Sequence, residues 1–340
     1  MSIKVIVVDD SALIRALLTQ IIDAEPDMHV VATAPDAFIA RDLVKRYEPD
    51  VMTLDIEMPK MHGLEFLKRL MHGHPMPVIM ISSLTDQNSD FTFQALELGA
   101  VDFFHKPTNG SPNEILIYAD VIVEKIRAAA SANIHRRTAK SIRKILCEGK
   151  TIPELLAIGA STGGTEAILR LLHHLPNSCP GIVIVQHMPA GFTASFAERL
   201  NRQTSFTVKE AEGGERIRSG LVFIAPGDKH LLIKKVGIHF YTELEESEPV
   251  NRHKPSVDKL FNSIADCAAT KTVAILLTGM GKDGAIGMLK LKEQGAFTVA
   301  QDEESCVVFG MPREAIAIDA ASEVLALDHI GPTLAEFFDW

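Results

Sequence analysis

Hydrophobic and polar positions alternate in blocks along the first part of the chain. Short runs rich in Val and Ile occupy residues 3–8, 30–33, 51–54, 78–81 and 101–104. Between these runs apolar residues recur at helical spacing, as at Leu13, Leu17 and Ile21. Strands that alternate with helices in this way form a parallel sheet covered on both faces. The pattern therefore predicts a doubly wound α/β domain.

A second pattern of the same kind begins after residue 151. The runs that predict strands cover residues 155–159, 182–185 and 273–278. The first of them leads through a glycine-rich turn into a helical run at residues 166–172. We expect a second α/β domain with a sheet of its own.

Charge is distributed unevenly along the 340 residues, whose formal net charge is −10. Residues 1–124 carry −10, residues 125–150 carry +7 and residues 151–340 carry −7. The basic strip contains Ala and Ser between its charges, as a solvated linker does, and its acidic flanks would repel nucleic acid. We predict a first domain at residues 1–125, a basic linker at 126–151 and a second domain at 152–340.

Composition excludes several classes of protein. The chain is 46% hydrophobic and 23% charged, which is typical of soluble proteins and excludes a disordered chain or a coiled coil. No apolar run approaches the ~20 residues of a membrane span, and the first residues do not resemble a signal peptide. The four cysteines are widely spaced, which favours neither a zinc site nor disulfides. We expect a cytoplasmic, monomeric protein that neither inserts into membranes nor binds nucleic acid.

Reactive side chains follow the predicted strands of the first domain. Asp9 and Asp10 follow the first strand, and Asp55 follows the third. The carboxyl ends of parallel strands meet at one edge, oxygen ligands suit Mg²⁺, and an aspartate can act as a nucleophile toward a phosphoryl donor. One such acid would indicate only a helix cap. Three acids, with Ser82 and Lys106 ending the fourth and fifth strands, favour a phosphate and metal site.

The motifs VVDDS, LDIEMPKMHG, VIMISS and VDFFHKP resemble those of the receiver domains of two-component response regulators. The resemblance covers residues 1–125 and implies a flavodoxin-like, five-stranded domain in which Asp55 accepts a phosphoryl group. It implies that Lys106 contacts that group, that Ser82 is the switch hydroxyl and that Phe103 is the switch aromatic. The implied Mg²⁺ ligands are Asp9, Asp10, Asp55 and the backbone carbonyl of Glu57.

The turn after the first strand of the second domain reads GASTGG, with Ser161 at its centre. A dinucleotide site would need glycine at that position, and a phosphate P-loop would need the sequence GK[ST]. What remains is GxSxG, a strand–turn–helix that exposes a serine nucleophile. Many such turns only begin a helix, so this motif alone is weak evidence.

His187 and Asp283 follow two other predicted strands of the second domain. We expect both at the same sheet edge as Ser161, where a histidine can act as the general base for a serine and an aspartate can orient it. Their meeting depends on strand order, which the pattern leaves open. The chain order serine, histidine, aspartate also differs from that of α/β-hydrolases. Thr162 and the backbone near Met280 are candidate oxyanion donors.

Other polar residues of this domain are less specific. We interpret His230 and His253 as polar packing or substrate contacts, and Asp258 as a helix cap or ion-pair partner. The acidic residues within 243–248 are expected to form a solvated loop.

A series of motifs in chain order resembles the response-regulator methylesterases of bacterial chemotaxis (protein-glutamate methylesterases). They are GASTGG, QHMPAGFTASFAERL, IAPGDKHL, RHKPSVDKLF, LLTGMGKDGA and AQDEESCVVFGMPREA. With the receiver motifs, the resemblance covers nearly the whole chain except the linker. It implies a doubly wound, Rossmann-like serine-hydrolase domain, larger than the first domain. It also implies Ser161 as nucleophile, His187 as general base and Asp283 as orienting acid.

The resemblance also implies the activity and its partners. Such enzymes remove methyl esters from chemoreceptor glutamates, and many also deamidate receptor glutamines. The implied partners are methyl-accepting chemoreceptors and a chemotaxis histidine kinase. The implied cofactor is Mg²⁺ for receiver phosphorylation, with none for ester hydrolysis. The receiver is expected to lie over the serine site and to expose it when phosphorylated.

Three alternatives remain: a DNA-binding response regulator, a catalytically silent scaffold, and a generic serine hydrolase gated by phosphorylation. An acidic α/β segment at 152–340 is too long for a lone helix-turn-helix module and poorly suited to duplex binding. We therefore expect a phosphorylation-activated methylesterase that serves sensory adaptation.

Overall fold

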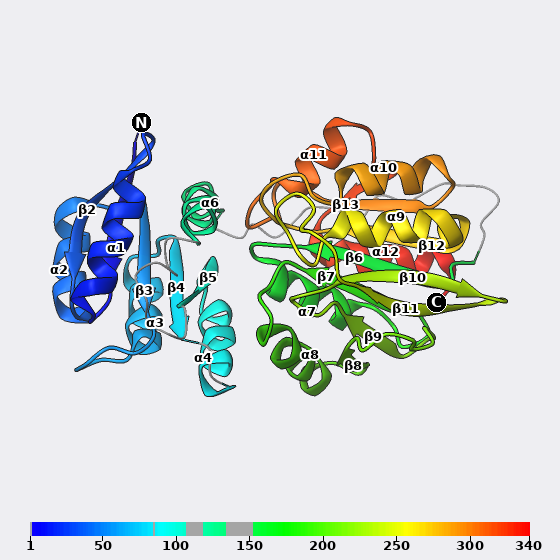
Figure 1. The fold of residues 1–340 in the computed structure, drawn as a ribbon, viewed down its shortest axis with the longest axis horizontal. Coiled ribbons are helices and arrows are strands. Elements are labelled where there is room, and N and C mark those ends of the chain that lie inside the picture. The colour runs from blue at the N-terminus through cyan, green and yellow to red at the C-terminus, as the bar shows by residue number, and fades with distance from the viewer. Residues whose placement is uncertain (1, 84–85, 107–117, 134–151) are drawn as a thin grey trace. The chain divides into compact units, whose positions relative to one another are not determined.

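The structure is a computed structural model that describes residues 2–83, 86–106, 118–133 and 152–340, with only the backbone described for 82–83 and 86–89. The chain forms two compact units, Met1–Ile134 and His135–Trp340. Each unit is an α/β fold built on its own parallel sheet (Figure 1). The fold class predicted from the sequence is thus confirmed.

The first unit contains a five-stranded parallel sheet in the order β2-β1-β3-β4-β5. Its strands are β1 (Ile3–Val8), β2 (Met28–Ala34), β3 (Val51–Asp55), β4 (Val78–Ser83) and β5 (Asp102–Lys106). The chain winds from β1 to β2 on one side and then returns to β3 on the other. Ligands of such sheets bind outside the carboxyl ends of the strands at this reversal, which here places Asp9 and Asp55 side by side.

Helices cover both faces of this sheet. They are α1 (Ala12–Asp23), α2 (Ala37–Tyr47), α3 (Gly63–Gly73), α4 (Asp86–Glu97) and α6 (Ala119–Ala130). Side chains cap the helix starts: the Ser11 hydroxyl accepts from the amide of Ile14 at 3.4 Å, and Asp36 accepts from Phe38 and Ile39 at 3.0 Å. These caps follow directly from the residue types at the strand ends.

The second unit contains a seven-stranded parallel sheet in the order β14-β13-β12-β6-β7-β9-β8. Its strands are β6 (Leu155–Ala160), β7 (Gly181–Gln186), β8 (Thr207–Glu210), β9 (Leu221–Ile224), β12 (Thr272–Leu276), β13 (Phe297–Gln301) and β14 (Glu323–Leu325). Every residue of β6, β7 and β12 is buried, which explains their uninterrupted apolar sequences. The winding reverses between β6 and β12, so the functional edge is expected there.

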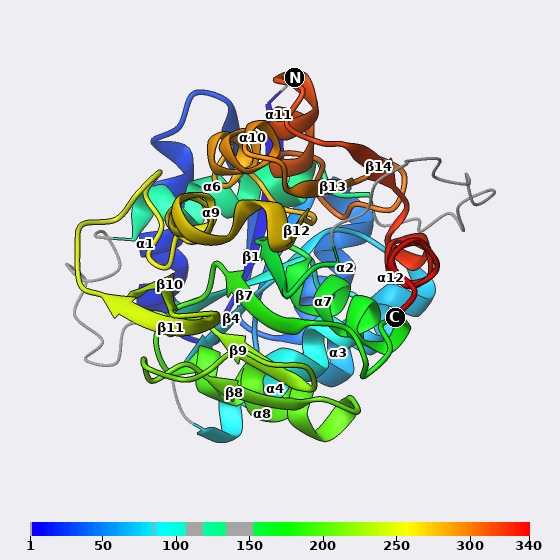
Figure 2. The same ribbon diagram turned by 90° about the vertical axis from the view of Figure 1, so that its right-hand side faces the viewer.

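Two layers of helices enclose the second sheet (Figures 1 and 2). One layer holds α7 (Gly164–His174), α8 (Phe192–Gln203) and α12 (Leu327–Phe338). The other holds α9 (Val257–Ala268), α10 (Ala285–Glu293) and α11 (Met311–Ala317), and a single 3₁₀ turn, Ala269–Lys271, leads from α9 into β12. The buried side chains of α9 and α10 join those of the sheet in one apolar core.

Two expectations differ from the structure. The acidic residues within 243–248 do not form only a solvated loop, because Glu243 and Glu245 belong to β11 (His239–Glu245), which pairs with β10 (His230–Val236) in an antiparallel hairpin. Ion pairs of Glu243 with Lys234 at 3.7 Å and of Glu245 with Lys259 at 2.6 Å compensate these charges. The sequence pattern missed the hairpin because Lys234, Lys235 and Glu243 interrupt its apolar residues.

Helix α6 continues past residue 125, the predicted end of the first domain. Ile126, Ala128 and Ala129 are buried in it, so the helix belongs to the core of the first unit. The predicted linker at 126–151 lies from residue 134 onward outside the described residues, and the predicted boundaries otherwise stay predictions.

Cys179, Cys267 and Cys306 are free thiols, and Cys147 lies outside the described residues. None of the helices in the described ranges has both the length and the apolar character that crossing a membrane requires.

Candidate functional site

The first candidate site lies at the carboxyl edge of the receiver-like sheet. Carboxylate oxygens of Asp9, Asp10 and Asp55 lie within 4.8 Å of one another. Asp9 and Asp55 are buried, whereas Asp10 is exposed. The structure thus brings together the three acids that the sequence predicted to converge.

Lys106 compensates two of these acids. Its Nζ lies 2.8 Å from Asp9 Oδ2 and 2.8 Å from Asp55 Oδ2. The pKa of Asp55 is raised to about 6. Burial is the main cause, the charge of Lys106 opposes it, and the charge of Asp9 adds to it. The pKa of Lys106 is also raised, because the two carboxylates outweigh the effect of its burial. One ammonium therefore faces more negative charge than it can neutralise.

This excess of carboxylate fits a divalent cation. Mg²⁺ prefers oxygen ligands and commonly binds one or two carboxylates, with waters completing its shell. Asp9, Asp10 and Asp55 supply such oxygens within reach of a single ion. The amide of Glu57 donates to Asp55 Oδ1 at 3.4 Å, and the role of its carbonyl as a ligand stays a prediction.

The two predicted switch residues are placed differently. Phe103 is buried in β5, with the Lys125 ammonium 5.7 Å from its ring centroid. Ser82 lies in β4 opposite His105, but its side chain is outside the described residues. The expected role of the Ser82 hydroxyl therefore stays a prediction.

The second candidate site lies at the carboxyl edge of the larger sheet. Ser161 follows β6, His187 follows β7, and Asp283 lies in the turn between β12 and α10. Because β6 pairs with both β7 and β12, the three strands are adjacent. The meeting that sequence alone left open is thus decided by strand order.

The turn around Ser161 depends on two close approaches. Gly163 has φ +76°, and a Cβ added there would lie 2.6 Å from the Cβ of Val307. A Cβ on Gly279 would lie 2.7 Å from the Cβ of Ser161. Glycine at both positions lets the serine stand close to the loop after β12.

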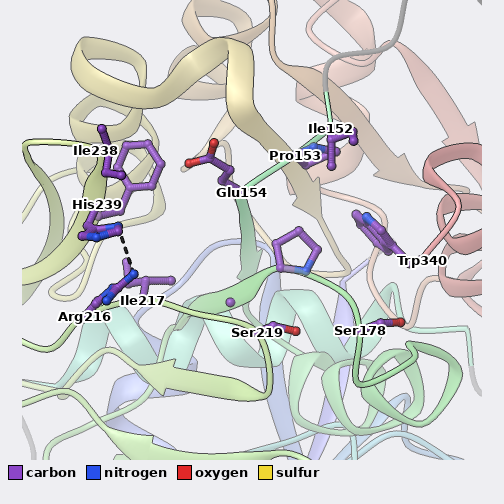
Figure 3. A pocket seen from close by; sticks show the side chains of 13 residues that line it. Ile152, Pro153, Glu154, Ser178, Arg216, Ile217, Ser219, Ile238, His239 and Trp340 are labelled. Atoms are coloured by element: carbon purple, nitrogen blue, oxygen red, sulfur yellow. Dashed lines mark hydrogen bonds between the residues drawn. The ribbon is translucent and has the colours of Figure 1, made fainter.

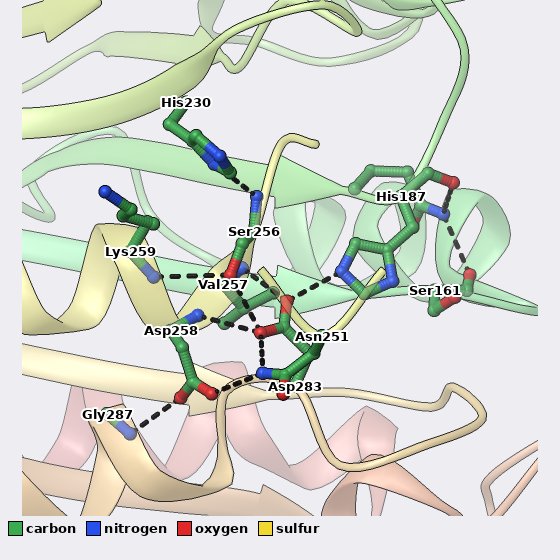
Figure 4. Close-up of polar contacts among 11 residues, drawn as sticks. Ser161, His187, His230, Asn251, Ser256, Val257, Asp258, Lys259, Asp283 and Gly287 are labelled. Atoms are coloured by element: carbon green, nitrogen blue, oxygen red, sulfur yellow. Dashed lines mark hydrogen bonds and ion pairs between the residues drawn. The ribbon is translucent and has the colours of Figure 1, made fainter. Parts of the chain in front are cut away.

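His187 is held by Asp283. Its Nε2 lies 2.9 Å from Asp283 Oδ2, and because a carboxylate only accepts, Nε2 carries the proton. The other ring nitrogen, Nδ1, is buried and has no hydrogen-bond partner in the described part of the chain. Figure 4 shows the imidazole lying between Asp283 and Ser161. A neutral His187 therefore offers Nδ1 as a free acceptor, which is what a general base requires.

Asp283 is almost completely buried, at 1% exposure, yet richly hydrogen-bonded. Its carboxylate accepts hydrogen bonds from the following groups (Figure 4): His187 Nε2 at 2.9 Å, Asn251 Nδ2 at 2.9 Å, Ser256 Oγ at 2.8 Å, and the amides of Val257 at 2.6 Å and Asp258 at 3.3 Å. Burial alone would raise the pKa of Asp283, but His187, Asn251 and Ser256 together hold it below its usual range. The carboxylate is thus a fixed anion.

The backbone near Ser161 contains a candidate oxyanion donor. The amide of Ser161 donates to the Thr278 carbonyl and that of Gly279 to the Val308 carbonyl, both at 3.0 Å. The amide of Met280 donates to no group among the described residues, and an amide without such a partner can hold an oxyanion if it faces one. Thr162 is buried, and its carbonyl accepts from the Thr278 hydroxyl at 3.0 Å. The contributions of Met280 and Thr162 to an oxyanion site stay predictions.

Two histidines interpreted as packing or substrate contacts have defined places. The ring of His253 stacks on that of His187 with centroids 3.7 Å apart and planes 12° from parallel. His230 is buried, accepts from the amide of Ser256 at Nδ1 and meets the Glu248 carbonyl at Nε2, both at 3.1 Å. With one nitrogen accepting and the other donating, His230 is neutral and structural.

Sequence reasoning missed Asn251 and Ser256, both of which bind Asp283. Asp258 was expected to cap a helix or form an ion pair, but its buried carboxylate instead accepts from Asn251 Nδ2 and the amide of Gly287. Asn251 and Ser256 lie close to His253 in the sequence, and this proximity was the only signal for them.

A cavity of about 310 Å³ lies elsewhere in the second unit (Figure 3). It is lined at the amino ends of β6 and β7 by Glu154 and Gly181, and the Arg216 guanidinium contacts His239 Nδ1 at 3.0 Å. Ser161 and His187 lie at the opposite, carboxyl ends of the same strands. This cavity is therefore separate from the candidate catalytic residues.

Comparisons with known proteins find relatives of both units. The family model described as CheB methylesterase matches residues 156–334, and that described as response regulator receiver domain matches residues 5–117. A protein-glutamate methylesterase/protein-glutamine glutaminase of Nitrosomonas europaea is 54% identical over 96% of this chain and 93% of its own. The corresponding protein of Salmonella typhimurium is 52% identical over 96% of this chain and 95% of its own.

A solved structure is also similar to the second unit. The Thermotoga maritima CheB methylesterase catalytic domain shares 42% identity and a TM-score of 0.53, covering 55% of this chain and all of that one. The family models match residues 156–334 and 5–117, and the relatives cover nearly the whole chain. The chain therefore belongs to the CheB methylesterase family, with a response regulator receiver domain preceding the methylesterase domain.

Proposed function

We propose that this chain is a phosphorylation-activated hydrolase that removes methyl esters from glutamates of chemoreceptors and deamidates receptor glutamines. The observation that carries the proposal is the state of His187: Asp283 binds Nε2, and Nδ1 is left without a partner beside Ser161. The names of the full-length relatives support the substrate class. The resulting carboxylates would adjust receptor output in sensory adaptation.

The chemistry follows from these groups. His187 Nδ1 takes the proton of the Ser161 hydroxyl as the serine oxygen bonds to the ester carbonyl carbon, and backbone amides such as that of Met280 hold the oxyanion. When the tetrahedral intermediate collapses, the bond to the methoxy oxygen breaks and His187 returns the proton to release methanol. Water then attacks the acyl-enzyme by the same route and leaves a glutamate carboxylate. A glutamine would follow the same steps with ammonia as the leaving group.

The fixed anion of Asp283 has two roles in this sequence. It keeps the proton of neutral His187 on Nε2, so that Nδ1 faces the serine, and it stabilises the imidazolium formed during attack. The low pKa of Asp283 means that this charge persists throughout the physiological range.

The receiver-like site would control the esterase. Asp55 would accept a phosphoryl group from a histidine kinase, and Lys106 would contact that group. Mg²⁺ held by Asp9, Asp10, Asp55 and the Glu57 carbonyl would neutralise charge on the phosphoryl donor. Phosphorylation would shift the population of the chain toward a form with an open serine site, with Ser82 and Phe103 as switch residues. Because Phe103 cannot donate a hydrogen bond, its part in switching would be a change of rotamer.

A methanol-release assay on methylated chemoreceptor membranes tests the proposal. Wild-type protein should release methanol faster after addition of a small phosphodonor with Mg²⁺. Ser161→Ala should lower kcat by ~10⁴–10⁶. Ser195→Ala is a matched control, because that serine lies in α8 and its hydroxyl only contacts the Gly191 carbonyl at 3.4 Å. Equal rates for wild type and Ser161→Ala would refute the catalytic assignment.

A further inference from the structure

Asn251 joins two buried carboxylates that no other described side chain connects. Its Nδ2 lies 2.8 Å from Asp258 Oδ2 and 2.9 Å from Asp283 Oδ1 (Figure 4). An amide nitrogen carries two hydrogens, so one donor group satisfies both acceptors. Asp258 and Asp283 are 6% and 1% exposed, and neither has a lysine or arginine partner among the described residues. The Asn251 amide is therefore the neutral spacer between two like charges.

The backbone at this position favours asparagine. Asn251 has φ +52°, in the left-handed region that asparagine tolerates better than most residues. Val250 and His253 form an antiparallel bridge around it, with their amides and carbonyls paired at 2.9 and 3.0 Å. This tight turn places Asn251 and His253 on one short, hydrogen-bonded segment.

The same turn reaches the catalytic histidine. His253 stacks on His187, while Asn251 binds the oxygen of Asp283 that does not face His187. The Ser256 hydroxyl binds that same oxygen, Oδ1, so Oδ2 is left to His187 and the amide of Val257. One short segment therefore sets the orientation of both members of the base–acid pair.

We propose that Asn251 is a positioning residue of the esterase: its amide orients Asp283 toward His187 and insulates it from the carboxyl group of Asp258. This inference rests on the proposed roles of Ser161, His187 and Asp283. Asn251 itself is not expected to touch the substrate.

The pKa values of Asp258 and Asp283 are shifted in opposite directions, although both carboxylates are buried. The pKa of Asp258 is raised to about 6. Burial is the main cause, and the nearby charge of Asp283 adds to it, while the amide of Gly287 and the Asn251 side chain act in the opposite direction. The pKa of Asp283 is held below its usual range despite burial. The other titratable groups in contact with this cluster are His187 and His253, and His230 reaches it through the amide of Ser256.

Asn251→Asp tests the role without changing side-chain size. Aspartate also tolerates the left-handed region, but it replaces a donor with a third carboxyl group. Additional negative charge near His187 favours the imidazolium. The acid limb of the pH–rate profile should therefore move upward by roughly half a pH unit or more, and the rate on its plateau should fall about tenfold or more.

The readout is the rate at which a neutral fluorophosphonate labels Ser161 in the full-length protein. In this step the serine oxygen bonds to phosphorus, fluoride leaves and the hydroxyl proton passes to His187. The reaction needs no receptor, so it probes the base–acid pair independently of the natural substrate. Asn201→Asp is the matched control, because the Asn201 side-chain oxygen only accepts from the amide of Val208 at 2.9 Å, in α8 and away from the site.

The outcomes separate this inference from the proposed function. An unchanged pH midpoint in Asn251→Asp, with wild-type labelling intact, would overturn the role of Asn251. If Asn251→Asp does not fold, Asn251→Ala should still label at least about tenfold more slowly than wild type, and an equal rate would overturn the role. Absence of wild-type labelling would overturn the triad and the inference together. Normal labelling without methanol release from receptors would refute only the proposed function.

Discussion

Asp55 and Asp283 occupy the corresponding place in two similar folds, but their surroundings give them opposite properties. Both are buried at the carboxyl edge of a parallel sheet, close to the reversal of winding. Asp55 faces Asp9 and one lysine, and its pKa is raised to about 6. Asp283 receives hydrogen bonds from side chains and backbone amides, and its pKa is lowered.

This difference teaches that burial does not decide what a carboxylate can do. The number of donors aimed at it decides the outcome. Asp283, with its donors already in place, is suited to remain an anion and hold a histidine. Asp55, which lacks enough positive charge, is suited to gain a cation and a phosphoryl group. Each of the following experiments changes one side of this comparison.

The largest effect is expected from Asp283→Asn. An amide at this position can donate to His187 and favour the wrong tautomer, with the proton on Nδ1. The turnover rate should fall by about 10⁴, as measured by methanol release at saturating substrate. A loss of less than tenfold would show that the hydrogen bond to Nε2 is not needed for catalysis. Asp266→Asn, at an exposed ion pair with Lys290, serves as control.

Asp55→Asn should abolish the response to a phosphodonor while leaving the serine site intact. The lost stimulation should be about 5- to 150-fold, the range of ordinary coupling between two sites. Methanol release with and without phosphodonor measures it. Asp50→Asn is the comparison, because that carboxylate only accepts from the amide of Lys4 at 2.8 Å. A response retained in Asp55→Asn would place the acceptor elsewhere.

Asp10→Asn should weaken binding of Mg²⁺ to the receiver by about tenfold, because a neutral amide replaces one of three clustered carboxylates. Asp10 is exposed, so the variant should fold normally. Calorimetric titration with MgCl₂ measures the dissociation constant. Wild-type affinity in this variant would remove Asp10 from the ligand set.

The last effect concerns the stability of the metal-free receiver. A raised pKa for Asp55 means that its protonated form stabilises the fold below about pH 4 and that this stabilisation is lost as pH rises to about 6. Asn cannot ionise, so Asp55→Asn should be more stable than wild type at pH 7.5 in EDTA, by at most about 3 kcal/mol. Loss of the ion pair with Lys106 reduces this gain.

The midpoint of thermal unfolding of the receiver measures the effect. The difference between Asp55→Asn and wild type should shrink as the pH falls toward 4, and added Mg²⁺ should stabilise wild type more than the variant. A difference independent of pH would show that ionisation of Asp55 is not its cause.

Much of the fold could be predicted because its signals are local. The predicted strands at 3–8 and 182–185 correspond to β1 and β7, since buried parallel strands are continuous apolar runs. The helix after Ser161 was visible from its periodicity. The β10–β11 hairpin was missed, because Lys234, Lys235 and Glu243 interrupt its apolar pattern. The charges of Lys234 and Glu243 compensate each other only after the strands pair.

The candidate site was predictable to the extent that it lies on strand ends and motifs. Ser161, His187 and Asp283 stand where a parallel sheet presents reactive groups. Asn251 was not found, because its contacts with Asp283 and Asp258 span 32 and 7 residues and depend on a left-handed turn. No spacing rule connects a residue in an irregular loop with a carboxylate in another.

The sequence by itself therefore determined two doubly wound domains and the residues at the ends of their strands, because the side-chain period and turn chemistry act over a few positions. Only the tertiary structure decided that β12, β6 and β7 are neighbours, which brings Ser161, His187 and Asp283 to one edge. It also decided that Asp55 is short of positive charge while Asp283 is amply hydrogen-bonded. Such differences arise from the distances between groups far apart in the chain, which exist only once the strands are ordered and the loops between them are packed.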